Sequence, residues 1–196
     1  MSFGVQGREL LIGVTGGIAA YKTAYLVSRL VQQQARVTVV MTAAARRFVG
    51  TATFAALTGR PVATDVFAEH SHPLGPHIEL AERAELMCVA PATADILARL
   101  ALGLADDLLT TLALSVHCPL LVAPAMNSQM WAKPAVQRHV ATLRADGVTV
   151  IDPPSGWLSC RQTGPGRMAE PDAIYEAICS ALAAASGHQP PPTPQS

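Results

Sequence analysis

The segment LLIGVTGGIAA, residues 10–20, decides the fold of this chain. Its first five residues are apolar apart from one glycine and predict a buried β-strand, and Gly16 and Gly17 then predict a tight turn. A helical pattern of apolar residues follows over residues 21–31. A buried strand, a short turn and a helix form the first unit of a parallel α/β sheet whose faces are covered by helices.

The same pattern recurs along the chain. It predicts further buried strands at residues 36–41, 86–90, 119–123 and 148–151, and further helices at residues 43–57, 77–84, 96–102, 108–116, 134–144 and 171–185. Five alternations of strand and helix predict an α/β fold, a three-layer flavodoxin- or Rossmann-like parallel sheet with helices on both faces. We expect one domain over residues 1–185, with a lid at about residues 153–168, and a disordered proline-rich tail over residues 186–196.

The composition limits the partners and ligands. The 196 residues carry 14 basic and 14 acidic side chains, so we expect no nucleic acid and no membrane surface as a partner. No apolar run approaches the roughly 20 residues of a membrane-spanning helix, and residues 1–9 lack the order of a signal peptide, which favours a cytoplasmic protein. The four cysteines show no C-x-x-C spacing, so no metal site is expected. A charged fraction of only 14% favours a homo-oligomer.

The glycine turn is a candidate phosphate site. Backbone N–H groups at a helix start point toward such a turn, and Gly16 and Gly17 let an anion approach closely. The next predicted strand ends at Thr42, whose hydroxyl and following amides are possible further contacts. A dinucleotide site would usually place an acidic residue near this position, and its absence favours a mononucleotide over NAD. The alternative is that the two glycines only form a tight turn.

The segment PAMNSQMW, residues 124–131, is a candidate substrate site. It follows a predicted strand, and ligands of open α/β sheets bind beyond the carboxyl ends of the strands. Asn127 offers a hydrogen-bond donor and an acceptor within an apolar wall of Met126, Met130 and Trp131, which suits a small polar substrate. The alternative is an ordinary loop whose large side chains fill the core.

His77 and the loop at residues 153–168 supply further candidates. His77 lies at a predicted helix start, where the helix dipole favours a neutral imidazole that can accept a proton; a surface or capping histidine is the alternative. The loop is rich in proline and glycine, as is typical of a lid, and Arg161 and Arg167 would favour the Cys160 thiolate and could hold an anionic substrate. The alternative is a mobile surface loop with an incidental cysteine.

Taken together, PAMNSQMW, the helix start at His77 and the glycine-rich lid resemble the flavin-dependent cysteine decarboxylases. The resemblance runs from about residue 10 to residue 170, and its three motifs occur in the order of that family. The pattern P-A-M-N-x-x-M-W is highly specific, whereas the N-terminal glycine turn is not. The resemblance implies the loss of carbon dioxide from a small cysteinyl substrate, with FMN bound between the subunits of a homotrimer or of a larger assembly of trimers, such as a dodecamer.

The resemblance also implies roles for individual residues. By similarity, His77 is the catalytic base, Cys160 is the proton donor on the lid, and Asn127 holds the substrate carboxylate. Met130 and Arg167 would be further substrate contacts. The implied FMN contacts are Gly16, Gly17, Ile18, Thr42, Ala44, Thr93, Ala94, Asp95, Ile96 and Ala123.

Two groups within the resemblance differ in the final proton transfer. Family members that act on a coenzyme A precursor protonate an ene-thiol and need a donor cysteine, whereas the peptide-cysteine decarboxylases stop at the ene-thiol. Cys160, followed by GPGRM at residues 164–168, favours the first group. A non-catalytic FMN-binding regulatory protein and a flavin prenyltransferase are further alternatives. Asp95 and Arg161 stand where the family commonly has asparagine and glycine.

Overall fold

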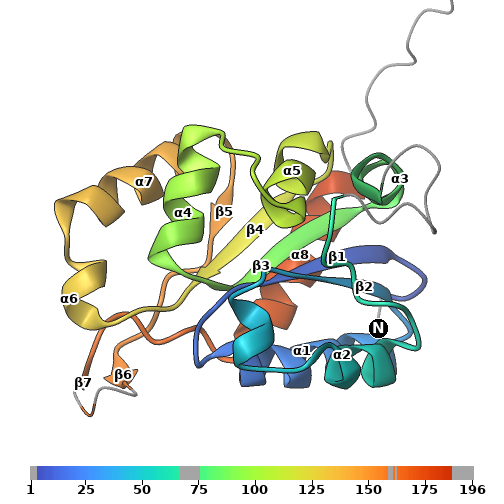
Figure 1. Cartoon of the computed structure of the whole chain (residues 1–196), viewed down its shortest axis with the longest axis horizontal. Coiled ribbons are helices and arrows are strands. Elements are labelled where there is room, and N and C mark those ends of the chain that lie inside the picture. Colours follow the sequence, from blue (N-terminus) through green and yellow to red (C-terminus); the bar gives the residue numbers. More distant parts are fainter. Residues whose placement is uncertain (1–3, 67–75, 159–160, 162, 187–196) are drawn as a thin grey trace, which may run out of the picture.

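The computed structural model describes residues 4–66, 76–158, 161 and 163–186. Its centre is a parallel sheet with the strand order β2-β1-β3-β4-β5 (Figure 1). The strands are β1 (Glu9–Val14), β2 (Arg36–Met41), β3 (Leu86–Ala92), β4 (Leu120–Pro124) and β5 (Thr149–Val150). All four pairings are parallel, so the predicted parallel sheet is confirmed.

Helices cover both faces of the sheet. The buried clusters divide them into two layers, with α1 (Ala20–Gln32), α2 (Thr51–Thr58) and α8 (Pro171–Ser186) on one face and α3 (Pro76–Arg83), α4 (Ala94–Leu102), α5 (Leu108–Ser115) and α7 (Pro134–Ala145) on the other. One short helix, α6 (Ser128–Trp131), follows β4. The three-layer α/β fold expected from the sequence is therefore present.

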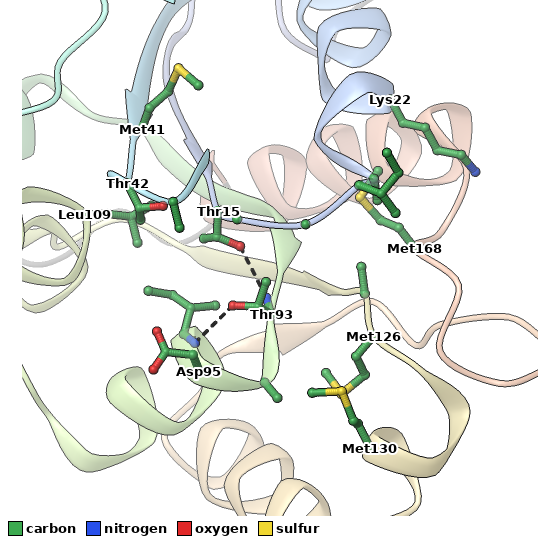
Figure 2. A pocket seen from close by; sticks show the side chains of 18 of the residues that line it. Thr15, Lys22, Met41, Thr42, Thr93, Asp95, Leu109, Met126, Met130 and Met168 are labelled. Carbon is green, nitrogen blue, oxygen red and sulfur yellow. Dashed lines mark hydrogen bonds between the residues drawn. The ribbon is translucent and has the colours of Figure 1, made fainter. Parts of the chain in front are cut away.

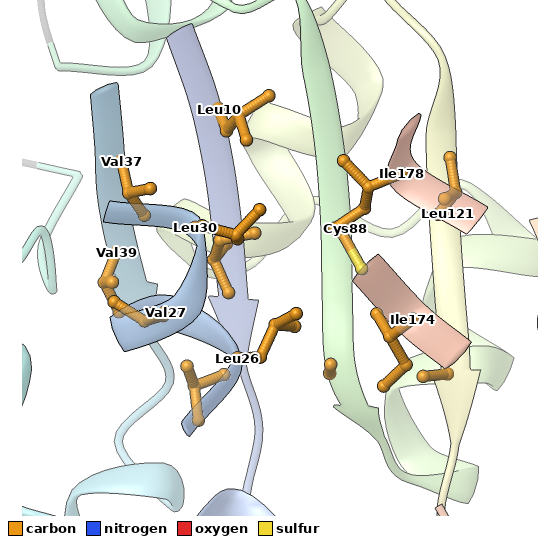
Figure 3. Close-up of a cluster of buried hydrophobic side chains, with 14 of the residues drawn as sticks. Leu10, Leu26, Val27, Leu30, Val37, Val39, Cys88, Leu121, Ile174 and Ile178 are labelled. Atoms are coloured by element: carbon orange, nitrogen blue, oxygen red, sulfur yellow. The ribbon is translucent and has the colours of Figure 1, made fainter. Parts of the chain in front are cut away.

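The strands are continuously apolar because both of their faces are buried. In β1, Leu10 packs toward α1, whereas its neighbour Leu11 packs into the cluster of the opposite face. Leu26 and Leu30 of α1 lie over β1 and β2, and α8 covers β3 and β4 (Figure 3). A strand buried on two sides shows no alternation of polar and apolar residues, which explains the unbroken apolar runs of the sequence.

Several helix ends follow local capping rules. Thr93 accepts a hydrogen bond from the Ile96 N–H and caps α4, and Asp107 forms a capping box with Thr110 at the start of α5. Gly103 ends α4 in the left-handed conformation, at φ 66°. Asp107 therefore has a structural role at the start of α5.

Two predicted segments have a different structure. The single helix expected over residues 43–57 is a short 3₁₀ turn, Ala45–Arg47, followed by α2, because the extended backbone of Gly50 separates them. The loop predicted at residues 153–168 contains two short strands, β6 (Gly156–Trp157) and β7 (Thr163–Gly164), which pair as an antiparallel hairpin. The disordered tail was predicted over residues 186–196, but Ser186 is the last residue of α8, and residues 187–196 lie outside the described residues.

Candidate active site

A large cavity opens at the carboxyl ends of the strands. The helix after β1 covers one face of the sheet and the helix after β3 covers the other, which leaves a crevice between these two strands, the usual ligand site of a 2-1-3-4-5 sheet. The cavity has a volume of about 1020 Å³ and is lined by the turns after β1, β2, β3 and β4 and by the lid hairpin. Single small-molecule sites occupy roughly 300–1,000 Å³, so there is room for a cofactor and a substrate.

The buried hydroxyl of Thr15 joins two of these turns. Thr15 Oγ1 donates to the Pro91 carbonyl over 2.6 Å and accepts a hydrogen bond from the Thr93 N–H over 3.3 Å (Figure 2). Thr93 in turn caps α4 through the Ile96 N–H. These hydrogen bonds fix the turns after β1 and β3 relative to each other. A ligand that contacts one turn therefore lies at a defined position relative to the other.

The glycine turn and the turn after β2 pack closely together. A Cβ atom at Gly16 would lie 2.4 Å from the Cβ of Ala44, whereas one at Gly17 would meet nothing closer than 3.7 Å. Thr42 Oγ1 accepts a hydrogen bond from the Ala45 N–H. Helix α1 starts here with neither a side-chain cap nor an acidic residue in its first turn. Small residues, backbone amides and an uncompensated helix N-terminus together fit a phosphate group.

Asp95 brings a negative charge to the cavity wall, and Arg99 compensates it. Arg99 Nε lies 3.0 Å from Asp95 Oδ2, one turn away on α4, and Arg99 Nη1 lies 2.5 and 2.6 Å from the two carboxylate oxygens of Asp106. These hydrogen bonds, the one to Asp106 above all, raise the pKa of Arg99. The carboxylate of Asp95 is therefore not an isolated charge in the cavity wall.

The PAMNSQMW segment forms the opposite wall of the cavity. Asn127 is half-buried, and its Oδ1 accepts a hydrogen bond from the Gln129 N–H over 2.7 Å, which caps α6. Met126 and Met130 face the cavity across from Thr42 (Figure 2). Trp131 does not line the cavity and packs against the buried cluster of the α4 face, so its expected place in the apolar wall is wrong.

The lid returns to this wall through Gly166. Its carbonyl accepts a hydrogen bond from the Met126 N–H over 2.9 Å, and its φ of 119° is a conformation that favours glycine. A Cβ atom at position 166 would lie 2.4 Å from the Met126 carbonyl oxygen. Trp157 of the hairpin also lines the cavity and is 63% exposed. The base of the lid is thus fixed to the candidate substrate segment.

Most of the predicted site residues meet at this cavity. Those that line it are Gly16, Gly17, Ile18, Thr42, Ala44, Thr93, Ala94, Asp95, Ile96, Asn127, Met130 and Arg167. Ala123 does not line it, because it is fully buried within β4. His77 lies on α3 and does not line the cavity of its own chain; its Nδ1 is buried and has no hydrogen-bond partner within the part of the chain that is described. Cys160 lies outside the described residues.

Sequence reasoning missed several polar residues of the site, among them Thr15, Lys22 and Arg99. Thr15 precedes the glycine turn, and its role depends on β3, which is 76 residues away. Lys22 and Arg99 also line the cavity, each four positions after a predicted contact, Ile18 and Asp95 respectively. Because residues four apart share one face of a helix, this spacing could have identified Arg99 from Asp95 on α4. Ile18 precedes α1, so the same argument does not reach Lys22.

Two further features are absent from the described residues. No helix there is long and apolar enough to cross a membrane. No group of three histidine, cysteine or acidic side chains in the same ranges could hold a metal ion. Burial raises the pKa of the Cys88 thiol to about 12, so this residue of β3 is an inert part of the core.

A 2-1-3-4-5 parallel sheet with a glycine turn at the β1/β3 crevice defines the flavodoxin-like class of α/β folds, in which ligands bind at that edge. The family model described as Flavoprotein matches residues 4–183. The chain belongs to the Flavoprotein family.

Curated relatives are bifunctional proteins of coenzyme A biosynthesis. CoaBC of Mycobacterium tuberculosis is 50% identical over 167 residues, which is 85% of this chain and 40% of that protein. CoaBC of Bacillus subtilis is 46% identical over 172 residues, which is 88% of this chain and 42% of that protein. The chain thus spans about two fifths of the length of the curated relatives it matches.

Solved structures with the same fold include cysteine decarboxylases. The FMN-dependent cysteine decarboxylase SpaF is 36% identical, with a TM-score of 0.80 over 93% of this chain and 98% of that one. A PPC decarboxylase with a cysteine-to-serine substitution, complexed with pantothenoylaminoethenethiol, is 31% identical, with a TM-score of 0.79 over 88% of this chain and 97% of that one. The resemblance inferred from the sequence motifs is therefore confirmed.

Proposed function

We propose that this chain binds FMN and decarboxylates phosphopantothenoylcysteine to phosphopantetheine, a step of coenzyme A biosynthesis. The observation that carries the proposal is the single cavity in which the phosphate-sized glycine turn, Asn127 and the lid hairpin meet. The cysteine decarboxylase structures and the CoaBC relatives support the same reaction. A peptide-cysteine decarboxylase and a non-catalytic FMN-binding protein are the alternatives.

The cavity fits FMN. The turn at Gly16, Gly17 and Ile18 and the turn at Thr42 and Ala44 would hold its phosphate through backbone amides and the Thr42 hydroxyl. The residues from Thr93 to Ile96 would supply further contacts at the start of α4. Bound FMN supplies the electron sink that direct loss of carbon dioxide from a cysteinyl carboxylate lacks, by taking a hydride from the substrate and later returning it.

The chain's own residues orient the substrate and move protons. Asn127 binds the substrate carboxylate and fixes it beside the apolar wall of Met126 and Met130. His77 accepts a proton when the substrate thiol is oxidised, and Cys160 on the lid donates a proton to the ene-thiol carbon in the last step. A closed lid keeps water away from these steps.

His77 requires a second copy of the chain, because it does not line the cavity of its own chain. The cavity rim also carries exposed apolar side chains, since Ile18 is 57% exposed and Tyr21 is 60% exposed. A neighbouring subunit that covers this rim would complete the cavity and bring its His77 to it. We propose a homotrimer or an assembly of trimers as the active form.

A complementation experiment tests this arrangement. His77→Asn and Asn127→Asp are each expected to yield an assembled, inactive, FMN-containing protein. If copies share active sites, co-expression of the two variants produces mixed sites that contain an intact His77 and an intact Asn127, and activity returns. Mixed assemblies without activity would show that each chain uses its own His77.

Product analysis tests the reaction itself. The purified FMN-loaded protein is incubated with phosphopantothenoylcysteine, and the product is identified by mass spectrometry. Saturated phosphopantetheine is expected from the wild type. Cys160→Ser is expected to release carbon dioxide and to stop at the ene-thiol. An ene-thiol from the wild type would favour the peptide-decarboxylase alternative, and no product would favour the non-catalytic one.

A further inference from the structure

A cluster of three charged side chains lies at the cavity rim. Lys22 Nζ is 3.0 and 3.1 Å from the two carboxylate oxygens of Glu170, and Arg167 Nη2 is 2.6 Å from Glu170 Oε1. Lys22 and Arg167 both line the cavity. One carboxylate therefore holds two cations side by side, one from α1 and one from the segment after the lid, and the cluster keeps a net charge of +1.

The position of Lys22 is unfavourable unless an anion is nearby. It lies in the first turn of α1, where the positive end of the helix dipole favours acidic side chains, and this turn contains none. Its side chain is only 12% exposed, so water compensates the charge poorly. Figure 2 shows Lys22 beside Met168 at the edge of the cavity. Glu170 neutralises only one of the two cations, which leaves the pair able to accept a second anionic group.

Arg167 connects this pair to the lid. A Cβ atom at Gly156 would lie 3.0 Å from Arg167 Cδ and 3.2 Å from Arg167 Nη1, so the arginine side chain runs close along strand β6. The hydrogen bonds with Lys22 lower the pKa of Glu170, which keeps its carboxylate charged at neutral pH. The two cations thus lie together beside Glu170, and both line the cavity.

We propose that Lys22 and Arg167, positioned by Glu170, form a subsite for a phosphate monoester at the rim of the cavity. This inference rests on the proposed function and deepens it, because both the proposed substrate and FMN end in such a group. A phosphate monoester carries nearly two negative charges and three acceptor oxygens, which suits one ammonium and one guanidinium group. The subsite would distinguish a phosphorylated substrate from a peptide.

Two ratios test the subsite, one of kinetic constants measured on the FMN-loaded protein and one of flavin affinities measured on the apo protein. The first is kcat/KM for phosphopantothenoylcysteine divided by kcat/KM for pantothenoylcysteine. The second is the affinity for FMN divided by the affinity for riboflavin. Lys22→Met removes the ammonium group and retains the apolar stem, and we expect it to lower one of the two ratios by about tenfold. Arg167→Met is expected to lower the same ratio.

Arg29→Met is the matched control. Arg29 also lies on α1 and pairs with a carboxylate of α8, Asp172, but it does not line the cavity. Its substitution removes the same charge, and both ratios are expected to match those of the wild type.

The outcomes separate the possible sources of the phosphate. A fall in the first ratio assigns the subsite to the substrate, and a fall in the second assigns it to FMN. Wild-type values of both ratios in Lys22→Met would overturn the subsite. If the wild type converts neither substrate, the proposed function fails, while the comparison of FMN with riboflavin still decides whether the subsite exists.

Discussion

Gly16→Ala should destabilise the fold, whereas the same substitution one residue later should not. The added Cβ at position 16 would lie 2.4 Å from Ala44 Cβ, 3.1 Å from the Ala44 carbonyl carbon and 3.3 Å from Ala44 Cα. Two backbone segments would have to separate, because no flexible side chain is available to move. At Gly17, the nearest atoms lie at 3.7 and 3.9 Å, which is ordinary contact.

The expected size of the effect follows from these contacts. Overpacking a closely packed site costs about 1–3 kcal/mol. Replacing glycine by alanine without strain stabilises by about 0.4–1 kcal/mol, because the unfolded chain loses conformational freedom. We therefore expect the free energies of unfolding of Gly16→Ala and Gly17→Ala to differ by about 2 kcal/mol. For a chain of this size, that difference corresponds to roughly 4–8 °C in Tm.

Urea and thermal unfolding of the apo proteins at one fixed protein concentration measure this difference. Apo protein is used because a methyl group at position 17 faces the ligand site and would confuse a binding assay. A second substitution, Ala44→Gly, removes the contact at 2.4 Å and leaves those at 3.1 and 3.3 Å. The double variant should therefore recover more than half of the lost stability. Equal stabilities of Gly16→Ala and Gly17→Ala would refute the reasoning.

Three further changes probe the charges of the site and of the fold. Arg99→Leu leaves the carboxylate of Asp95 uncompensated, so the midpoint potential of bound FMN should fall by about 20 mV, equivalent to about 1 kcal/mol for two electrons. An unchanged potential in a spectroelectrochemical titration would contradict this expectation. Glu9→Gln should lower the free energy of unfolding by about 1 kcal/mol at pH 7. The hydrogen bonds from Arg60 hold the pKa of Glu9 below its usual range. The stabilisation by Glu9 is therefore present above the unfolded-state pKa and is lost as the pH falls through the folded-state pKa. Urea titrations should show a smaller difference in free energy of unfolding between the wild type and Glu9→Gln at pH 3 than at pH 7. Asn127→Asp should lose binding of the cysteinyl substrate, and with it activity, through repulsion between carboxylates while FMN content stays normal, and an unchanged substrate affinity would count against the proposed role of the amide.

The sequence was sufficient to predict features that repeat or that are local. Each long strand is a run of about five apolar residues, and the strands alternate with helical patterns, so the parallel sheet could be predicted. Because the carboxyl ends of such strands meet at one edge, Gly16, Thr42, Thr93 and Asn127 could be expected to share one cavity, and all four line it.

The features that the sequence did not reveal depend on short elements or distant partners. Strands of two residues, as in the lid hairpin, show no periodicity. The pairing of Lys22 with Glu170 joins residues 148 positions apart, and nothing near either residue indicates it. The break at Gly50 was missed because the apolar pattern continues on both sides of it. The distance of His77 from the cavity could not be predicted from its place at a helix start.

The hydrogen bond between Met126 and Gly166 separates the lid residues whose sequence can vary from the position at which only glycine fits. A side chain at position 166 would collide with the Met126 carbonyl oxygen, so every functional variant must return to the sheet at this point with glycine. The segment before it, from the exposed Pro154 to the exposed Pro165, meets weaker restrictions, since a Cβ atom at Gly156 or Gly164 would lie 3.0 Å from side-chain atoms of Arg167 or Ser128. Exchanging residues 154–165 for the corresponding loop of a peptide-acting relative is therefore a direct route to altering substrate choice, with Gly166 retained as the fixed splice point.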